Sequence, residues 1–341
     1  MGHLGGGMST ATGPLEAILK KAINARERLF DAQHETAFRL FNGFLEGCPE
    51  LVIDLYAATV LLHNYADPPE QGASFIETAH VLLRDLFPWA RSFVLKTRHG
   101  ASLEDWKGKI LSGGEPDRKV CENGIWYAID LCMNRDASLY LDTRLLRRWA
   151  LQNLKGRTVL NAFAYTGSLG VAALGGGATR VLQLDSSRRF LNLADTSCRL
   201  NGFTVANQDF QVGDFWPQIE HLKRAGKRFE CVFLDPPFFS TTRRGVVEKN
   251  SARLINKVRP LIDDGGQLVA INNALFVSGK AYLEVLEDLC ADGYLQIEEL
   301  IPVPEDFTGY PETRQGSPVT NPAPFNHATK IAVLRVRRKA R

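Results

Sequence analysis

The stretch TVLNAFAYTGSLG (158–170) joins an apolar run to a glycine-bearing turn and to the start of a helical pattern. The apolar run is typical of a buried strand, and Gly167 is a residue that lets a ligand approach the backbone at a helix N-terminus. The dinucleotide-binding pattern GxGxxG is absent. Taken alone, the stretch therefore predicts a strand, a turn and a helix. The turn could bind a ligand, or it could be an ordinary connection between a strand and a helix.

Apolar runs and helical patterns alternate outward from this stretch, from about residue 140 to the end of the chain. The expected strands are 158–163, 180–185, 206–214, 229–237, 266–273, 294–301 and 329–338, and the expected helices are 168–177, 186–202, 247–262 and 278–291. Such alternation predicts a parallel sheet covered by helices on both faces. The last two strands have no helix between them, so we expect a hairpin that reverses one of them. The result is an α/β fold with a Rossmann-like, mostly parallel seven-stranded sheet and an antiparallel terminal strand.

The first part of the chain has a different pattern and predicts a smaller α+β domain at 14–135, followed by the α/β domain at 136–341. The expected elements are helices at 14–34 and 74–86, strands at 51–56, 58–67, 92–97 and 124–131, and a loop and linker at 98–122. Residues 1–13 lack the apolar core of a signal peptide and are expected to form a disordered leader.

Composition excludes some classes of protein and leaves others open. No run of about 18 apolar residues occurs, so no membrane span is expected. The six cysteines form no CxxC pair, which favours buried reduced thiols in a cytoplasmic protein without a metal site. The formal net charge of +3 neither requires nor excludes a nucleic acid partner, so a local basic surface would have to bind one.

Two acidic residues follow expected strands. Asp185 ends RVLQLD, 18 residues after Gly167, at the place where such sheets bind a ribose diol. Asp214 follows the next short strand and is a candidate to bind an adenine amino group. Both residues are also good helix caps, so the capping interpretation stays open for each.

The tetrapeptide Asp235-Pro236-Pro237-Phe238 ends the strand VFLDPP and is the most specific of these motifs. Ligands of open α/β sheets bind at the carboxyl ends of the strands. Two prolines make the loop rigid and remove two N–H groups, and Phe238 or Phe239 is a candidate to stack on a base. The basic residues that follow are candidates for phosphate contacts, although a solvated helix face remains the alternative; they are Arg243, Arg244, Lys249, Arg253, Lys257 and Arg259.

The order of these motifs resembles that of a known family. The chain contains YLDTR (140–144), NAFAYTGS (161–168), Asp185, Asp214 and DPPFFS (235–240), followed by INN (271–273). This order resembles the large-subunit ribosomal RNA methyltransferases of the RlmI/RlmK type over about residues 123–300, and residues 39–65 also look like that family's preceding domain. The resemblance implies the class I methyltransferase fold, S-adenosylmethionine (SAM) as cofactor and large-subunit rRNA as partner. No PUA-type RNA-binding domain is apparent.

The resemblance also implies roles for individual residues. Tyr165, Thr166 and Gly167 would line the methionine part of SAM, Asp185 would hold the ribose, and Asp214 the adenine. The neighbouring positions expected at the cofactor are Phe163, Ala164, Ser186 and Phe215. Asp142 and Arg144 would close over the amino-acid end. Asp235, with Pro236, Pro237 and Phe238, would form the catalytic edge.

One departure from the family pattern bears on the reaction. The cytosine C5 branch uses a cysteine nucleophile just after the strand that follows DPP, whereas here VAINNAL (269–275) contains none, and Phe238 occupies the alternative position. Asn272 and Asn273 instead resemble the branch that methylates guanine N7, and an exocyclic amine acceptor is also compatible with DPPF. We therefore expect direct transfer to a base nitrogen, with Asn272 and Asn273 at the acceptor.

Several alternatives remain open at this point. The long loop at 301–330 is either an ordinary hairpin connection or a functional segment in which Asn326 and His327 contact acceptor or cofactor. The other functions compatible with the motifs are cytosine C5 methylation, methylation of a protein or small molecule, and a degenerate SAM-fold assembly factor. A dehydrogenase is disfavoured because GxGxxG is missing. The oligomeric state is not predicted.

Overall fold

The computed structural model describes residues 12–237, 241–242, 245–246 and 251–338. The chain divides into two compact units. Unit 1 contains residues up to 122, together with 129–141 and 305–317, and unit 2 contains 123–128, 142–304 and the residues from 318 onward. The chain therefore passes between the units several times, which a single boundary near residue 135 does not describe.

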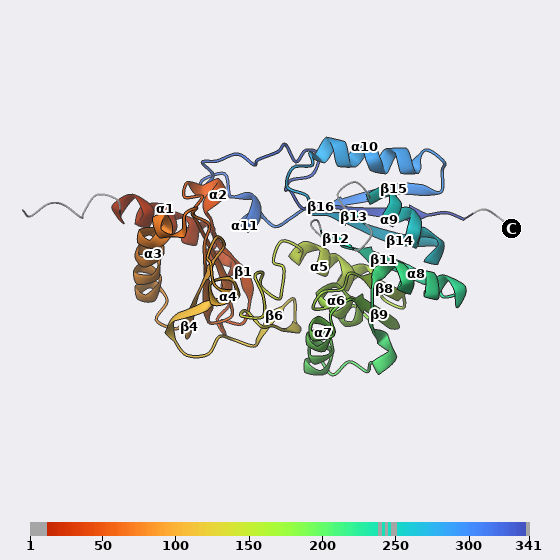
Figure 1. Cartoon of the computed structure of the whole chain (residues 1–341), viewed down its shortest axis with the longest axis horizontal. Helices are drawn as coiled ribbons and strands as arrows, with labels where there is room; N and C mark the ends of the chain where they lie inside the picture. The colour runs from red at the N-terminus through yellow and green to blue at the C-terminus, as the bar shows by residue number, and fades with distance from the viewer. Residues whose placement is uncertain (1–11, 238–240, 243–244, 247–250, 339–341) are drawn as a thin grey trace, which may run out of the picture. The chain divides into compact units, whose positions relative to one another are not determined.

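Unit 2 contains a seven-stranded sheet in the order β10-β9-β8-β11-β14-β16-β15 (Figure 1). The strands are β8 (Thr158–Ala162), β9 (Arg180–Asp185), β10 (Phe210–Val212), β11 (Phe229–Leu234), β14 (Ile262–Asn272), β15 (Leu295–Ile301) and β16 (Lys330–Val336). Neighbouring strands from β10 to β14 are parallel, whereas β16 runs antiparallel to both β14 and β15. The predicted α/β sheet with one reversed terminal strand is confirmed, and the reversed strand lies inside the sheet rather than at its edge.

Alternate side chains of the central strands enter two hydrophobic clusters on opposite faces of this sheet. On β11, Cys231 and Phe233 join the cluster formed with α5 and α6, while Val232 and Leu234 join the one formed with α8, α9 and α10. The helices of unit 2 are α5 (Arg144–Asn153), α6 (Ser168–Gly175), α7 (Arg188–Leu200), α8 (Phe215–Arg224), α9 (Ser251–Val258) and α10 (Gly279–Cys290). Burial on both faces explains why these strands read as continuous apolar runs.

The shorter elements of unit 2 correct some predicted bounds. They are β7 (Ile125–Ala128), β12 (Thr241–Thr242), β13 (Gly245–Val246), and the 3-10 turns η3 (Asn207–Asp209) and η5 (Arg259–Leu261). The helix expected to reach 262 ends at Val258, because Pro260 lacks an N–H and the chain turns there into β14. The strand expected at 206–214 is reduced to β10, because Asp214 already caps α8.

Unit 1 is built on a five-stranded sheet in the order β1-β2-β3-β4-β5, with α1 and α3 packed on one face. Only the β3–β4 pair is parallel. The strands are β1 (Ala37–Asn42), β2 (Leu51–Tyr56), β3 (Thr59–Asn64), β4 (Ser92–Thr97) and β5 (Lys109–Gly113), with β6 (Lys119–Glu122) outside this sheet. The helical elements are α1 (Thr12–Ala25), η1 (Glu27–Leu29), α2 (Gly43–Glu46), η2 (Pro69–Gly72), α3 (Ala73–Leu86), α4 (Leu103–Lys107) and α11 (Glu305–Thr308).

Two predictions for unit 1 were wrong in detail. The segment 98–122 is not only loop and linker, since it contains α4, β5 and β6. The strand β5 is short, partly exposed and at the edge of its sheet, so it lacks the apolar alternation that identifies a strand. The helix expected at 14–34 ends at Ala25, because Arg26 leaves the helical conformation and its side chain turns into the core.

The segment 305–317 is fixed to unit 1 by buried polar contacts. Arg26 and Glu46 form a fully buried ion pair of 2.9 Å. Arg26 also donates to the carbonyl of Asp306 at 3.0 Å, the Asp306 carboxylate accepts the Arg39 N–H at 2.9 Å, and the Thr313 hydroxyl donates to Glu46. Part of the loop expected to connect two strands of the α/β domain therefore packs as part of unit 1.

None of the helices described is long and apolar enough to cross a membrane.

Candidate active site

The turn that follows β8 has an unusual backbone. Phe163 and Tyr165 have φ values of 59° and 51°, and Gly167 has φ 77°. Left-handed backbone is unfavourable for residues with a Cβ, and such strain is concentrated at functional sites. A Cβ on Gly167 would lie 2.4 Å from the Cβ of Ala194, so only glycine fits there. The turn is therefore held in a conformation that its own residues do not favour.

Hydrogen bonds to β9 hold this turn in place. The N–H of Ala164 donates to the carbonyl of Leu184, and the N–H of Tyr165 donates to Oδ2 of Asp185, both at 2.8 Å. Behind the turn, the buried Gln183 side chain donates to the carbonyl of Gly167 at 3.2 Å. Thr166 is buried as well. The predicted cofactor residues 163–167 and Asp185 thus come together as one hydrogen-bonded unit.

Asp185 ends β9 and faces two backbone donors. Its Oδ1 accepts the N–H of Ser187 at 2.9 Å, while its Oδ2 accepts that of Tyr165. Burial raises the pKa of its carboxyl, and the surrounding N–H groups oppose that rise. Ser186, which lies between Asp185 and Ser187 in the sequence, is exposed. A carboxylate oxygen can accept more than one hydrogen bond, so Asp185 can also accept one from a ligand hydroxyl.

The start of α8 lies against the same turn. The ring of Phe215 stacks on that of Phe163, with 4.6 Å between centroids and 19° between planes. Asp214 is the N-cap of α8 and accepts the N–H of Trp216 at 2.9 Å. Asp214 therefore caps a helix, as the alternative interpretation expected. Its side chain is exposed, and its carboxylate can accept further hydrogen bonds.

Asp235 follows β11 at the carboxyl edge of the sheet. Its Oδ1 is fully buried and has no hydrogen-bond donor among the described residues, although the residue as a whole is partly exposed. Burial, together with the nearby Asp142 carboxylate, raises the pKa of Asp235 to about 7. Pro236 is partly exposed and Pro237 is exposed. A buried carboxylate oxygen without a donor, on a residue whose pKa is strongly shifted, marks Asp235 as a candidate functional residue.

Asp142 and Arg144 lie at the start of α5. Arg144 is the first residue of that helix, and Asp142 accepts a hydrogen bond of 2.7 Å from the hydroxyl of Thr329. Asp142 and Asp235 are close enough to repel each other electrostatically. This edge of unit 2 is therefore acidic, and it suits a ligand that carries positive charge.

The end of β14 supplies the predicted acceptor residues. Asn272 donates through Nδ2 to the hydroxyl of Ser251 at 3.3 Å and accepts the N–H of Ala274 at 3.0 Å, whereas Asn273 is exposed. The buried Lys330 donates to the carbonyl of Ala274 at 3.0 Å. Burial lowers the pKa of Lys330 to about 8. The turn at 272–274 is thus fixed from both sides.

Asn326 and His327 make local contacts in the loop before β16. The Asn326 side chain exchanges hydrogen bonds with the backbone of Val303, at 2.9 and 2.8 Å, and His327 accepts the N–H of Thr329 through Nδ1 at 3.1 Å. These contacts give both residues a part in shaping the loop. That Asn326 and His327 contact the acceptor or the cofactor remains a prediction. The other residues predicted to bind the substrate, Phe238, Phe239, Arg243 and Arg244, lie outside the described residues.

Comparison with known proteins identifies the fold and the family. A sequence family described as S-adenosylmethionine-dependent methyltransferase matches residues 52–308. The chain belongs to this methyltransferase family. It is similar to ribosomal RNA large subunit methyltransferase I of Aeromonas hydrophila, with 30% identity over 86% of this chain and 76% of the relative. It is also similar to methyltransferase K/L of Shewanella amazonensis, with 30% identity over 76% of this chain but 37% of that relative.

A solved structure supports the fold of the methyltransferase. The crystal structure of SMU.776 complexed with SAH superposes with a TM-score of 0.83 at 22% identity, covering 97% of this chain and 83% of that one. The expected class I methyltransferase fold is confirmed, and SAM is the cofactor of the family.

The residues of this methyltransferase fit that cofactor. SAM carries a sulfonium and an ammonium group, and the edge formed by Asp142 and Asp235 is acidic. One buried oxygen of this edge has no donor within the described part of the chain. Asp185 is available to the ribose diol, and Phe163 and Phe215 offer an apolar wall to a ring. No group of three or more potential metal ligands occurs in the described part of the chain.

Sequence reasoning missed two residues of the methyltransferase edge. Thr329 binds Asp142 and Lys330 fixes the end of β14, yet both lie in the expected terminal strand and were not selected. The available signal was a lysine between apolar residues in ATKIAVL (328–334), since a buried lysine needs oxygen acceptors.

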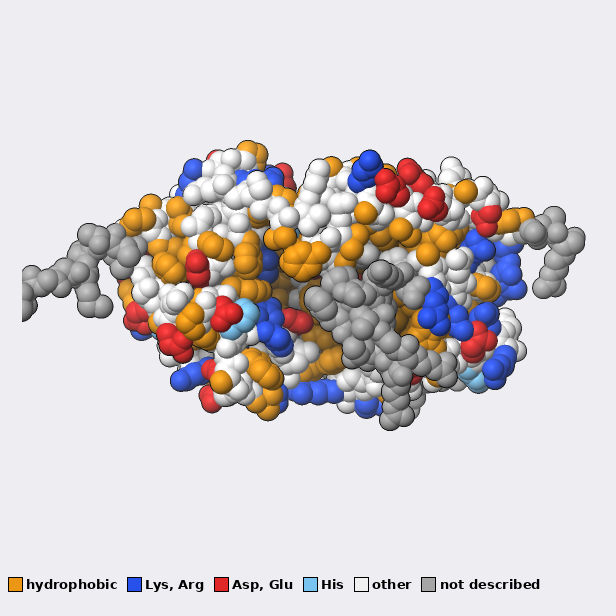
Figure 2. Space-filling model, turned by 45° about the horizontal axis from the view of Figure 1, so that its top comes forward, with side chains coloured by type: hydrophobic (Ala, Val, Ile, Leu, Met, Phe, Trp, Pro, Cys, Tyr) orange, Lys and Arg blue, Asp and Glu red, His pale blue; other side chains and the backbone are white. Residues whose placement is uncertain are grey.

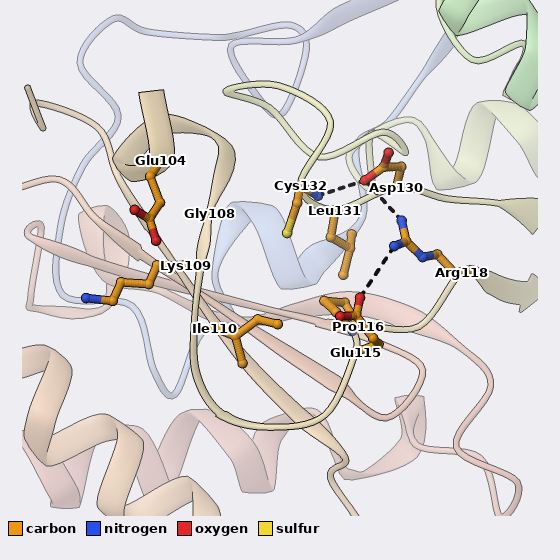
Figure 3. Close-up of a pocket in the computed structure, with 10 residues that line it drawn as sticks. All are labelled: Glu104, Gly108, Lys109, Ile110, Glu115, Pro116, Arg118, Asp130, Leu131 and Cys132. Atoms are coloured by element: carbon orange, nitrogen blue, oxygen red, sulfur yellow. Dashed lines mark hydrogen bonds and ion pairs between the residues drawn. The ribbon is translucent and has the colours of Figure 1, made fainter. Parts of the chain in front are cut away.

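A pocket of about 580 Å³ lies in unit 1 and contains none of these residues (Figure 3). Three of its charged side chains pair with one another, since Arg118 approaches Glu115 at 3.5 Å and Asp130 at 3.4 Å. Asp130 also accepts the N–H of Cys132 at 3.1 Å, as Figure 3 shows. The pocket thus lacks the unpaired acceptor seen at Asp235.

Proposed function

We propose that this methyltransferase transfers the methyl group of SAM to a base nitrogen of large-subunit ribosomal RNA, either guanine N7 or an exocyclic amine. The relatives named as ribosomal RNA large subunit methyltransferases support the acceptor class. The observation that carries the proposal is the buried Oδ1 of Asp235 at the carboxyl edge of β11, which has no hydrogen-bond donor among the residues that the structure describes. An rRNA acceptor also implies the cytoplasm as the compartment.

The cofactor would be held by the strained turn after β8 and by the acidic residues. SAM supplies an electrophilic methyl group on a cationic sulfur. The turn at 163–167 admits the methionine part, Asp185 accepts hydrogen bonds from the ribose, and Asp214 with Phe215 borders the adenine. Asp142 and Asp235 together provide negative charge near the positive end of the ligand. Arg144, next to Asp142, is placed to bind the carboxylate of the methionine part.

Asp235 would then orient the acceptor base. Its free oxygen accepts a hydrogen bond from an amino or imino group of the base, which aligns the acceptor nitrogen with the methyl group. A guanine N7 is already nucleophilic and loses no proton. An exocyclic amine loses one after transfer, and a carboxyl with a pKa of about 7 can receive it. Asn272 and Asn273 lie at the neighbouring strand end and would contact the base edge.

Five of the six cysteines of this chain are in surroundings that disfavour a covalent mechanism. Burial raises the pKa of the Cys48, Cys132, Cys198, Cys231 and Cys290 thiols. A thiol that stays protonated is a poor nucleophile. The segment 269–275 contains no cysteine at all. Both observations favour direct transfer.

Mass spectrometry of nucleosides tests this function. Large-subunit rRNA from a deletion strain is incubated with the protein and methyl-labelled SAM, then digested to nucleosides. We expect a methylated guanine or a methylated exocyclic amine, lost with Asp235→Ala, and retained with each single Cys→Ser variant. Labelled 5-methylcytosine, or a covalent RNA adduct that one cysteine variant loses, would contradict direct transfer to nitrogen.

The same samples test the other classes of function. Label in protein or small-molecule fractions, with none in RNA, would favour those acceptors. Titration calorimetry with SAM separates an enzyme from an assembly factor, because a folded protein that binds no SAM cannot be a methyltransferase.

A further inference from the structure

Basic side chains gather on the face of unit 2 formed by α8 and α9. We call this surface the α8–α9 ridge and define it by Trp216, Lys223, Arg224, Arg253 and Lys257. Figure 2 shows Lys and Arg side chains concentrated around these helices, on the right of the picture. Within these two helices the only acidic residue is Glu220, whose carboxylate is shared by Lys223 and Lys257. The ridge is therefore locally basic, although the net charge of the whole chain is only +3.

Arg253 is the distinctive residue of this ridge. Its guanidinium carbon lies 4.4 Å from the centroid of the Trp216 ring, and the Lys257 ammonium lies 5.5 Å from the same centroid. Arg253 is exposed, and none of the described carboxylates lies within ion-pair distance of it. The cation–π contact with the indole restrains the guanidinium, whose N–H groups can still donate to an anion. A held arginine loses less entropy on binding a phosphate than a freely moving one.

The ridge is continuous with the candidate active site. Trp216 packs edge-on against Phe215 at 5.3 Å, and Phe215 stacks on Phe163 of the strained turn. At the other end, Ser251 begins α9 and accepts the hydrogen bond from Asn272 at the acceptor edge. A nucleic acid whose base reacts at this edge would therefore run close to both helices.

We propose that the α8–α9 ridge binds the phosphate backbone of the single-stranded RNA segment that carries the acceptor base, with Arg253 contacting a phosphate through its guanidinium edge. The proposal deepens the proposed function and rests on it. A base inside a duplex is inaccessible to the methyl group, so its segment must be unpaired or the base flipped out. Phosphates next to such a base then have to be held outside the reacting edge. An arginine restrained over an indole, beside two lysines, meets that requirement.

The experiment measures RNA binding and SAM binding on the full chain. A fluorescein-labelled single-stranded RNA of about 20 nucleotides is titrated at several salt concentrations, and methylation of large-subunit rRNA is followed in parallel. The variants are Arg253→Glu and Arg253→Gln, with Lys280→Gln as the matched control. Lys280 is an exposed cation on α10 in the same unit, and it pairs with Glu284 as close helical neighbours do. Calorimetry with SAM checks that each variant retains a folded cofactor site.

We expect Arg253→Glu to weaken RNA binding at least about tenfold, and Arg253→Gln to reduce the salt slope by about one. SAM affinity should stay within about twofold of the wild type, and Lys280→Gln should match the wild type in every measurement. If the wild type methylates rRNA and Arg253→Glu binds RNA equally well, the ridge is wrong while the proposed function stands. If the wild type neither binds nor methylates RNA, both fail. A preference for acidic protein over RNA would also overturn the assignment.

Discussion

Replacing Asp235 with asparagine removes a charge that the folded protein disfavours. Oδ1 of Asp235 is buried, and none of the described residues donates a hydrogen bond to it. Burial, together with the Asp142 carboxylate, raises the pKa of this carboxyl from 3.8 to about 7. The folded state therefore holds this proton more tightly than the unfolded state does. Stability from this group is complete below pH 3.8 and is lost as the pH rises towards 7. The Asp235→Asn variant carries no such group and should not lose that stability.

The size of the effect follows from the shift. At 1.36 kcal/mol per unit, a rise from 3.8 to about 7 corresponds to about 4 kcal/mol. Because the residue is partly exposed, solvent screening reduces this value to about 2 kcal/mol. About two thirds of it develops between pH 5 and pH 8, which amounts to about 3–5 °C in the melting temperature of a domain of this size.

The assay compares melting temperatures of the two proteins at pH 5 and pH 8. We expect Asp235→Asn to gain about 3–5 °C relative to the wild type between these two pH values. Other titrating groups are common to both proteins and cancel in the difference. Asp214→Asn serves as control, since its carboxylate lies at the same sheet edge but is exposed and already caps α8. A pH-independent difference for Asp235→Asn would refute the argument from burial.

Ligands extend the same experiment to the cofactor. SAM is cationic at sulfur, whereas SAH is a neutral thioether there. If Asp235 lies near that sulfur, SAM should stabilise the wild type more than the variant at pH 8, and SAH should stabilise both to a similar extent. Equal stabilisation by SAM in the two proteins would remove Asp235 from the cofactor site.

Three further predictions concern other parts of the chain. Gly167→Ala should weaken SAM binding at least tenfold in calorimetry, because the new Cβ would collide with Ala194. Gly202→Ala is the control, since Gly202 also has a positive φ of 68° but no atom near its Cβ position. This control should cost only about 1–2 kcal/mol of stability and should leave the affinity for SAM unchanged. Arg26→Met should lower the free energy of unfolding of unit 1 by about 3–5 kcal/mol in denaturant titration, because the buried Glu46 carboxylate is left without its cation. An unchanged midpoint would contradict this. Burial lowers the pKa of His63 from 6.5 to about 4. The stability that this group contributes above pH 6.5 should therefore be lost as the pH falls towards 4, by up to about 3 kcal/mol. The His63→Gln variant should show a weaker pH dependence when melting curves at pH 7 and pH 5 are compared.

The α/β part of the fold could be predicted because each element carries its own signal. Strands buried on both faces are continuous apolar runs, and the helices between them have a helical period. The segment 305–317 carries no such signal. Its contacts with unit 1 join residues more than 260 positions apart, as in the bond from Arg26 to the Asp306 carbonyl. Such pairings depend on the assembled fold rather than on local sequence.

The site was predictable to the extent that topology determines it. Parallel strands bring their carboxyl ends to one edge, so the turn after β8, Asp185 and Asp235 had to lie near one another. Their electrostatics could not be predicted. The proximity of Asp142 and Asp235, and the bond from Thr329 to Asp142 across 187 positions, appear only in the folded chain.

Several unfavourable features of unit 2 lie at this same edge. Phe163 and Tyr165 have left-handed backbone, Asp235 has an oxygen without a donor, and Asp142 adds a like charge beside it. Each feature costs stability in the free protein. A cationic ligand that places a hydroxyl pair near Asp185 and positive charge near the two other carboxylates would relieve the electrostatic cost. Binding of such a ligand would recover part of the free energy that these features cost the free protein, so the same residues that weaken this edge would contribute to affinity.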